Sequence, residues 1–320
     1  MSGFKLIMIS AMYENGGNTV HRLLDGHPEL FVYPYESQLG TSAVSDYLSS
    51  YVPFKYRWPE FPLDGQPEQD YELFFDEELK VMLRTPDRSK FRHMPLELDE
   101  ADRRRAFVGY MQGQPRTRAA LVEAFFRSTF DAWKNRQHSG RETAYLGYSP
   151  VLCLDTEKIV ADFPQAHIIH VVRNPYSAFS DTLKRPFPLG LERWVWTWNY
   201  CQMLALTYAE KYPRNFHVVR FEDLVADRLA TLGKLCAQLG LSWSDTCLAP
   251  SWNGTRLDEV YPWGTIRTAT PDANLATANL LSGDQQAQIK QLSILFQRQL
   301  GYEQLELEGF PGRGASKTAA

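Results

Sequence analysis

The segment LIMISAMYENGGNTVHRLL, residues 6–24, determines how the first part of the chain folds. It begins with an apolar run, breaks at a pair of glycines and continues with apolar residues at helical spacing. The apolar run does not alternate with polar residues, which is typical of a strand covered on both faces, as in a parallel sheet. The segment therefore predicts a strand over residues 6–10, a glycine-rich loop and a helix.

Apolar runs of the same kind recur further along the chain. They predict strands over 30–33, 167–172 and 216–220, and helices from Pro175 through Leu183, over 224–239 and over 285–300. Gly240 and Gly301 follow the last two helices, where a C-terminal glycine is expected. Strands that alternate with helices predict a three-layer α/β fold, with a P-loop-like parallel sheet flanked by helices.

Residues from about 40 to 140 differ from the rest of the chain because they are rich in aromatics, prolines and charges. They include an amphipathic helix around 118–133. We interpret this region as a mostly helical insertion that binds the acceptor, within a single domain over 1–308. Residues 309–320 are small and polar, and we expect a flexible tail there.

The composition excludes several classes of protein. The 320 residues hold 34 Lys and Arg against 38 Asp and Glu, with a net charge of −4, whereas proteins that wrap nucleic acid usually carry a basic face. An anionic ligand would therefore need a local positive site. No apolar run approaches the length of a membrane span, so no membrane partner is predicted, and a cytoplasmic enzyme is the default expectation. The sequence does not specify an oligomeric state.

The four cysteines are sparse and form no CxxC pair. They therefore indicate buried thiols in a reducing compartment and give little support to a structural zinc site. No metal site is predicted. The residues concerned are Cys153, Cys201, Cys236 and Cys247.

The loop at 15–19 has the position of a phosphate cradle, because a glycine pair that opens a helix turns backbone amides toward an anion. It lacks the lysine of GxxxxGK[ST] and cannot be read as GxGxxG, which disfavours a generic NTPase or a dinucleotide oxidoreductase. The alternative interpretation is a tight strand-to-helix turn without a ligand.

Three landmarks in order resemble sulfotransferases that use 3′-phosphoadenosine 5′-phosphosulfate (PAPS). Residues 15–19 followed by His27-Pro28 resemble the family's Arg/Lys-Ser-Gly-Thr-Thr loop and its His-Pro pair. Residues 163–175 resemble the family segment that ends in Arg-[Asp/Asn]-Pro, and 220–224 resemble Arg-[Tyr/Phe]-Glu-Asp-Leu. The resemblance implies transfer of a sulfuryl group from PAPS to a hydroxyl of a small-molecule or saccharide acceptor, with adenosine 3′,5′-bisphosphate (PAP) as product and no metal.

The resemblance also implies where the donor binds. The loop at 15–20 would cradle the 5′-phosphosulfate and Arg173 would hold the 3′-phosphate, since a guanidinium presents paired donors to phosphate. The family serine eight positions after that arginine is Asp181 here, and Ser180 falls one position early. Arg267 lies where related enzymes place a loop over the nucleotide. The predicted donor-binding residues are Asn15, Gly16, Gly17, Asn18, Thr19, Val20, Arg173, Ser180 and Arg267.

Glu36 is the predicted general base, because it follows the second strand and some sulfotransferase branches place a glutamate soon after the His-Pro pair. Aromatic neighbours would raise its proton affinity toward the useful range. The alternative is a solvent-facing loop carboxylate. His21 is a rival base only if its helix face turns toward the donor, and His27 is expected to order the turn before Pro28.

Two expected cations are missing. Asn15 stands where the family has Arg or Lys, and 147–150 replaces a segment that carries a second lysine. A lost positive donor typically costs a few kcal/mol of transition-state stabilisation. We expect another cation, such as Lys184 or Arg185, to take its place. The alternative is a noncatalytic, sulfotransferase-like protein that binds the nucleotide.

Overall fold

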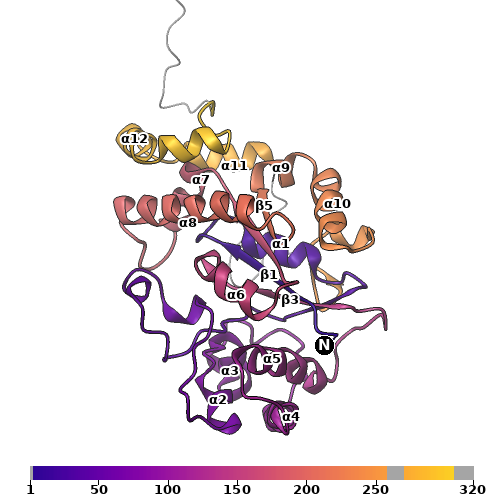
Figure 1. Ribbon diagram of the computed structural model, residues 1–320. Helices are drawn as coiled ribbons and strands as arrows, with labels where there is room; N and C mark the ends of the chain where they lie inside the picture. The colour runs from indigo at the N-terminus through magenta and orange to yellow at the C-terminus, as the bar shows by residue number, and fades with distance from the viewer. Residues whose placement is uncertain (1–2, 258–269, 306–320) are drawn as a thin grey trace, which may run out of the picture.

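The computed structural model describes residues 3–257 and 270–305 (Figure 1). Its centre is a five-stranded parallel sheet with the strand order β2-β3-β1-β4-β5. Because all the strands are parallel, the loops that follow them lie together at the carboxyl edge of the sheet. The strands are β1 (Leu6–Ala11), β2 (Leu30–Val32), β3 (Ala144–Tyr148), β4 (His167–Val172) and β5 (Phe216–Arg220).

Alternate residues of β1 enter two different hydrophobic cores, which confirms the three layers. Leu6 and Met8 belong to one core, and Ile7 and Ile9 belong to the other. The first core is formed with α5 (Arg118–Ala132), α6 (Thr156–Asp162), α7 (Pro175–Thr182), α8 (Leu191–Lys211), α11 (Pro271–Ala278) and α12 (Gly283–Gln299). The second core is formed with α1 (Gly17–Leu24), α9 (Phe221–Ala226) and α10 (Arg228–Leu239).

The structure differs from the sequence-based prediction at two elements. Strand β3 was not predicted, and it lies between β1 and β2, so that β1 is internal to the sheet. The helix predicted over 224–239 is two helices, α9 and α10, separated at Asp227. The Asp227 side chain accepts a hydrogen bond from the Ala230 amide and so caps α10, which explains the break.

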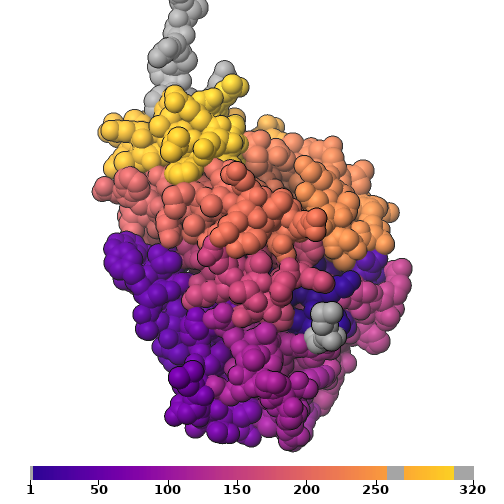
Figure 2. Space-filling view, in the orientation of Figure 1, coloured from indigo at the N-terminus to yellow at the C-terminus, as the bar shows by residue number. Residues whose placement is uncertain are grey.

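The segment between β2 and β3 contains the expected helices, namely α2 (Pro67–Leu73), α3 (Glu77–Arg84), α4 (Glu100–Met111) and α5. These helices gather at the end of the molecule opposite α11 and α12 (Figure 1). In the space-filling view the segment, coloured violet to magenta, forms a continuous lobe away from the yellow C-terminal helix (Figure 2). Short 3₁₀ turns occur at 47–50, 54–56, 86–88, 152–155 and 245–248, and β6 (Ser251–Trp252) pairs with β7 (Thr255–Arg256).

A buried ion pair attaches this lobe to the sheet. The Arg103 guanidinium on α4 lies 2.6 Å from Asp76, and the Tyr33 hydroxyl, directly after β2, donates to the same carboxylate at 2.7 Å. Arg103 also donates to Thr129 of α5. Because these groups are almost entirely buried, breaking the pair would leave an uncompensated charge in the core. The contact thereby fixes the chain that runs from Tyr33 to Glu36.

The tryptophans of α8 divide between the core and the surface. Trp194 and Trp198 are completely buried, whereas Trp196 is 55% exposed. Although α8 has 21 residues, neither it nor another helix in the described part of the chain is long and apolar enough to cross a bilayer.

Candidate functional site

A cavity of about 510 Å³ opens at the carboxyl edge of the sheet, between the loops that follow β1, β2, β3 and β4 and the start of α11. Several predicted site residues line it together: Gly16, Gly17, Asn18, Thr19, Glu36 and Arg173. Asn15, Val20 and Ser180 are buried and do not line it. Arg267 lies outside the described residues.

The glycines of the first loop are required by their surroundings. Gly16 has φ +92°, and a Cβ there would lie 2.3 Å from the Phe221 ring. A Cβ on Gly17 would lie 2.6 Å from the Tyr148 ring and 2.8 Å from the Ala11 side chain. Because α1 begins at Gly17, its first backbone amides and the positive end of its dipole lie at the cavity. This part of the site is suited to an anion.

Asn15 has a structural role at the base of the loop. Its side-chain oxygen accepts hydrogen bonds from the Arg173 amide at 2.9 Å and from the Trp198 indole at 3.2 Å. Its side-chain nitrogen donates to the Tyr13 carbonyl at 2.9 Å. With both ends of the amide engaged and no exposed surface, the side chain joins two loops instead of lining the cavity.

Arg173 is held by several acceptors at the other end of the cavity. Its Nε donates to Asn274 Oδ1 at 2.6 Å, and its Nη1 donates to the Glu14 carbonyl at 3.1 Å and to Asp181 Oδ2 at 2.6 Å. The guanidinium lies 5.1 Å from the centre of the Phe221 ring. Only 9% of this side chain is exposed, so its orientation is fixed by its partners.

Asn274 and Glu222 support Arg173, and neither was predicted to do so. Glu222 accepts hydrogen bonds from the Asn174 amide, from both Asn174 and Asn274 side chains and from the Tyr302 hydroxyl. Residues 270–272 contained a usable signal, since Thr followed by Pro and Asp is typical of a helix start. Glu222 therefore joins neighbouring loops and does not cap α9.

Lys184 and Arg185, the two cations expected to compensate for the missing ones, both line the cavity. Lys184 pairs with Asp181. Arg185 donates from Nε to the Glu14 carboxylate at 2.7 Å and lies 5.4 Å from the Tyr13 ring centre. About half of the Arg185 side chain is exposed, so it can change partners at little cost.

Glu36 lies beside a second carboxylate at the opposite wall. Its backbone amide donates to Glu78 Oε2 at 3.0 Å, and Gln38 donates to Glu36 Oε2 at 3.1 Å. Burial, and then the charge of Glu78, raise the pKa of Glu36 to about 7, although Lys90 acts in the opposite direction. Glu36 is therefore not an ordinary solvent-facing carboxylate, and a proton can exchange on it near neutral pH.

His21 also lines the cavity but is less suited to act as a base. Its two ring nitrogens lie 2.8 and 3.0 Å from Nη2 of Arg22, which limits their access to a proton. Burial, and then the charge of Arg22, hold the pKa of His21 well below its usual value. The geometry therefore favours Glu36 over His21.

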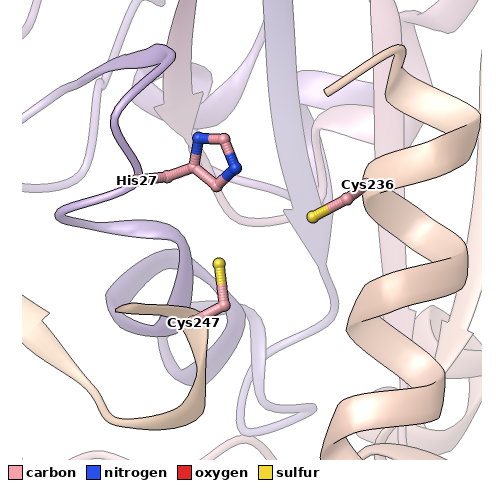
Figure 3. Close-up of side chains that lie close together, drawn as sticks. All are labelled: His27, Cys236 and Cys247. Carbon is pink, nitrogen blue, oxygen red and sulfur yellow. The ribbon is translucent and has the colours of Figure 1, made fainter. Parts of the chain in front are cut away.

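A separate buried cluster joins His27 to two of the free cysteines, Cys236 and Cys247 (Figure 3). The Glu29 amide can only donate, so His27 Nδ1 accepts at 3.1 Å, and Nε2 then donates to the Ser242 carbonyl at 2.9 Å. Both ring nitrogens are thus engaged with the backbone. His27 orders the turn before Pro28, as expected, and offers no free lone pair to a metal ion.

Comparisons with known proteins agree with this fold. A model described as the sulfotransferase family matches residues 7–245. The sulfotransferase domain of the olefin synthase from Synechococcus PCC 7002 is 16% identical with a TM-score of 0.59, and the match covers 94% of this chain and 96% of that one. The sulfotransferase domain from the curacin biosynthetic pathway is also 16% identical, with a TM-score of 0.52 and coverage of 94% and 98%. No curated protein sequence matches the chain significantly.

The position of Asn15 predicts that restoring a cation there will harm the protein. Asn15→Lys would bury an ammonium group and remove the hydrogen bonds to Arg173 and Trp198, so we expect a loss of about 2–4 kcal/mol in the free energy of unfolding. Urea denaturation measures this loss. Asn18→Lys, in the first turn of α1 and lining the cavity, is the matched control and should be tolerated. A stable and more active Asn15→Lys protein would show that the structural role is wrong.

Proposed function

This chain belongs to the sulfotransferase family, and we propose that it transfers a sulfuryl group from PAPS to a hydroxyl of a small-molecule or saccharide acceptor. One observation carries the proposal: a carboxylate with a pKa of about 7 opens on the same cavity as an anion-binding loop and a buried arginine. A base and two separate anion sites are the groups that this transfer requires.

In this proposal the donor spans the cavity. The 5′-phosphosulfate binds at residues 16–19, where the backbone amides at the start of α1 complement its charge. The 3′-phosphate binds Arg173, whose guanidinium is already oriented by Asn274 and the Glu14 carbonyl. Fixed amides and side-chain cations stabilise the transferring group here without a metal.

The acceptor enters between the donor and Glu36. Its hydroxyl oxygen forms the new bond to sulfur, the bond from sulfur to the bridging oxygen breaks, and that oxygen leaves on PAP. Glu36 takes the hydroxyl proton and later returns it to water. Tyr35 and Phe91, whose rings stack with centroids 4.0 Å apart, line this side and offer apolar surface to the acceptor.

Arg185 is the proposed replacement for the missing loop cation. It lines the cavity and its partner Glu14 directly precedes the anion-binding loop, so a short movement brings the guanidinium to the leaving oxygen. The rival proposal is a noncatalytic protein that binds the nucleotide. The buried position of Asn15 favours that rival only if neither Lys184 nor Arg185 acts on the donor.

A transfer assay with labelled PAPS and a panel of hydroxyl acceptors tests the proposed function. Glu36→Gln should keep PAP affinity within about threefold and lower turnover by about a hundredfold or more, because the amide cannot accept the proton. Glu157→Gln, an exposed change away from the cavity, should have no effect. Retained turnover in Glu36→Gln would eliminate this base, and PAP binding by the natural protein without transfer to any acceptor would support the rival.

The pH dependence of the rate gives a second test. The base must be deprotonated, so kcat/KM should rise with pH and reach its plateau above the Glu36 pKa of about 7. Glu78 raises that pKa, and Glu78→Gln should therefore move the rising limb to lower pH. Rates between about pH 5 and 9 measure both effects. An unchanged midpoint in Glu78→Gln would assign the limb to another group.

Replacing Arg185 tests the proposed cation. Arg185→Met should lower kcat by about a hundredfold, because stabilisation of the leaving oxygen is lost, and should change PAP affinity much less. Lys184→Met is the matched control, since Lys184 is the adjacent cation and pairs with Asp181. A larger kcat loss in Lys184→Met than in Arg185→Met would transfer the role to Lys184.

A further inference from the structure

The acceptors around Arg173 occupy the positions that a bound anion would need. Its Nη1 already contacts a carboxylate oxygen of Asp181 at 2.6 Å as well as the Glu14 carbonyl, and its Nε contacts Asn274. With 9% of the side chain exposed, Arg173 has little room to turn toward a new partner. A phosphate that binds this guanidinium must replace at least one of these contacts.

Asp181 is the partner that a phosphate resembles most. One carboxylate oxygen contacts Arg173 and the other contacts Lys184, so two cations converge on a single anionic group. The carboxylate lies in the last turn of α7 and lines the cavity. A phosphate placed between the same two cations would meet this negative charge at contact distance, which is unfavourable.

The Asp181 side chain can also move away from Arg173 toward solvent. Lys184 is 62% exposed, and 23% of the Asp181 side chain is exposed, whereas Arg173 is buried. A change of Asp181 rotamer toward solvent can therefore keep the contact with Lys184 and release Arg173. Such a movement breaks the contact between Asp181 and the buried Arg173, and a bound phosphate can replace that contact.

The charge of the whole cavity wall supports the same conclusion. Among the described residues that line it, five cations face four carboxylates. The cations are Arg22, Lys90, Arg173, Lys184 and Arg185, and the carboxylates are Glu14, Glu36, Glu78 and Asp181. These groups leave an excess of only one positive charge. A donor with two phosphate groups and a sulfate needs more than that, which a carboxylate that moves out of the cavity would provide.

We propose that Asp181 is a built-in counter-ion that occupies the 3′-phosphate site of the unliganded protein and is displaced when a 3′-phosphorylated nucleotide binds Arg173. This inference rests on the proposed function and adds a specificity-determining residue to it. Asp181 keeps the buried guanidinium paired in the absence of donor. Asp181 also lowers the affinity for PAP, so the product dissociates more readily. The 3′-phosphate must compete with its carboxylate for Arg173.

Calorimetric titration with two probes tests the inference: PAP, and adenosine 5′-phosphate, which lacks the 3′-phosphate. Asp181→Asn removes the competing charge and should tighten PAP binding by about tenfold or more, while adenosine 5′-phosphate changes by less than about threefold. Asp181→Ser repeats the test with a smaller side chain. Asp223→Asn, which removes an exposed acid outside the cavity wall, corrects for the change in net charge.

Thermal unfolding supplies a readout that a merely structural role would not give. Without ligand, Asp181→Asn should melt below the natural protein, because Arg173 loses its ionic partner. With saturating PAP this difference in melting temperature should become smaller or change sign, because the 3′-phosphate now supplies the ionic partner of Arg173. A lower melting temperature that PAP does not restore would overturn the inference.

The titrations also separate this inference from the proposed function. If the natural protein binds PAP and Arg173→Ala does not, but Asp181→Asn and Asp181→Ser bind it no more tightly, the donor site stands and the inference is wrong. If neither the natural protein nor either Asp181 variant binds PAP, both the inference and the proposed donor fail.

Discussion

The buried side-chain amide of Asn15 holds together the two loops on which the cavity depends. It accepts hydrogen bonds from the backbone of Arg173 and from the indole of Trp198, and it donates to the carbonyl of Tyr13. These hydrogen bonds hold the loop after β1 and the loop after β4 at a fixed separation. Since the first loop carries the amides proposed to bind one anion and the second carries Arg173, the spacing of the two proposed anion sites depends on this one side chain.

This arrangement explains how the chain can lack a cation at the loop position and still keep the site. A lysine at position 15 would need to leave the core to reach a ligand, whereas a neutral amide satisfies three hydrogen bonds inside it. In the proposed function, charge is supplied instead from the end of α7, where Lys184 and Arg185 line the cavity on exposed side chains. The site thus separates rigid positioning, done by Asn15 and Arg173, from mobile charge.

The sequence predicted the strands β1, β2, β4 and β5, the glycine loop and the insertion, because apolar runs and glycines indicate local burial and backbone geometry directly. It missed β3, whose short segment with Gly147 lacks a long apolar run, and it joined α9 to α10 because a cap at Asp227 interrupts an otherwise helical pattern. Asn274 and Glu222 were missed for a different reason. Asn274 contacts Arg173, and Glu222 contacts Asn274, from segments far apart in sequence. The helix start at 270–272 could be recognised locally, but its contact with Arg173 could not.

The environment of Glu36 argues for a catalytic protein over a nucleotide-binding relative. Holding a carboxylate in a buried site beside Glu78, with a raised pKa, costs folding free energy, and nucleotide binding alone gains nothing from it. A protein that only binds the donor would need the loop at residues 16–19 and Arg173, and would be better served by a neutral or positive group at position 36. The Arg103 and Asp76 pair fixes the chain that carries Glu36, so the lobe between β2 and β3 positions the proposed base next to the proposed acceptor side.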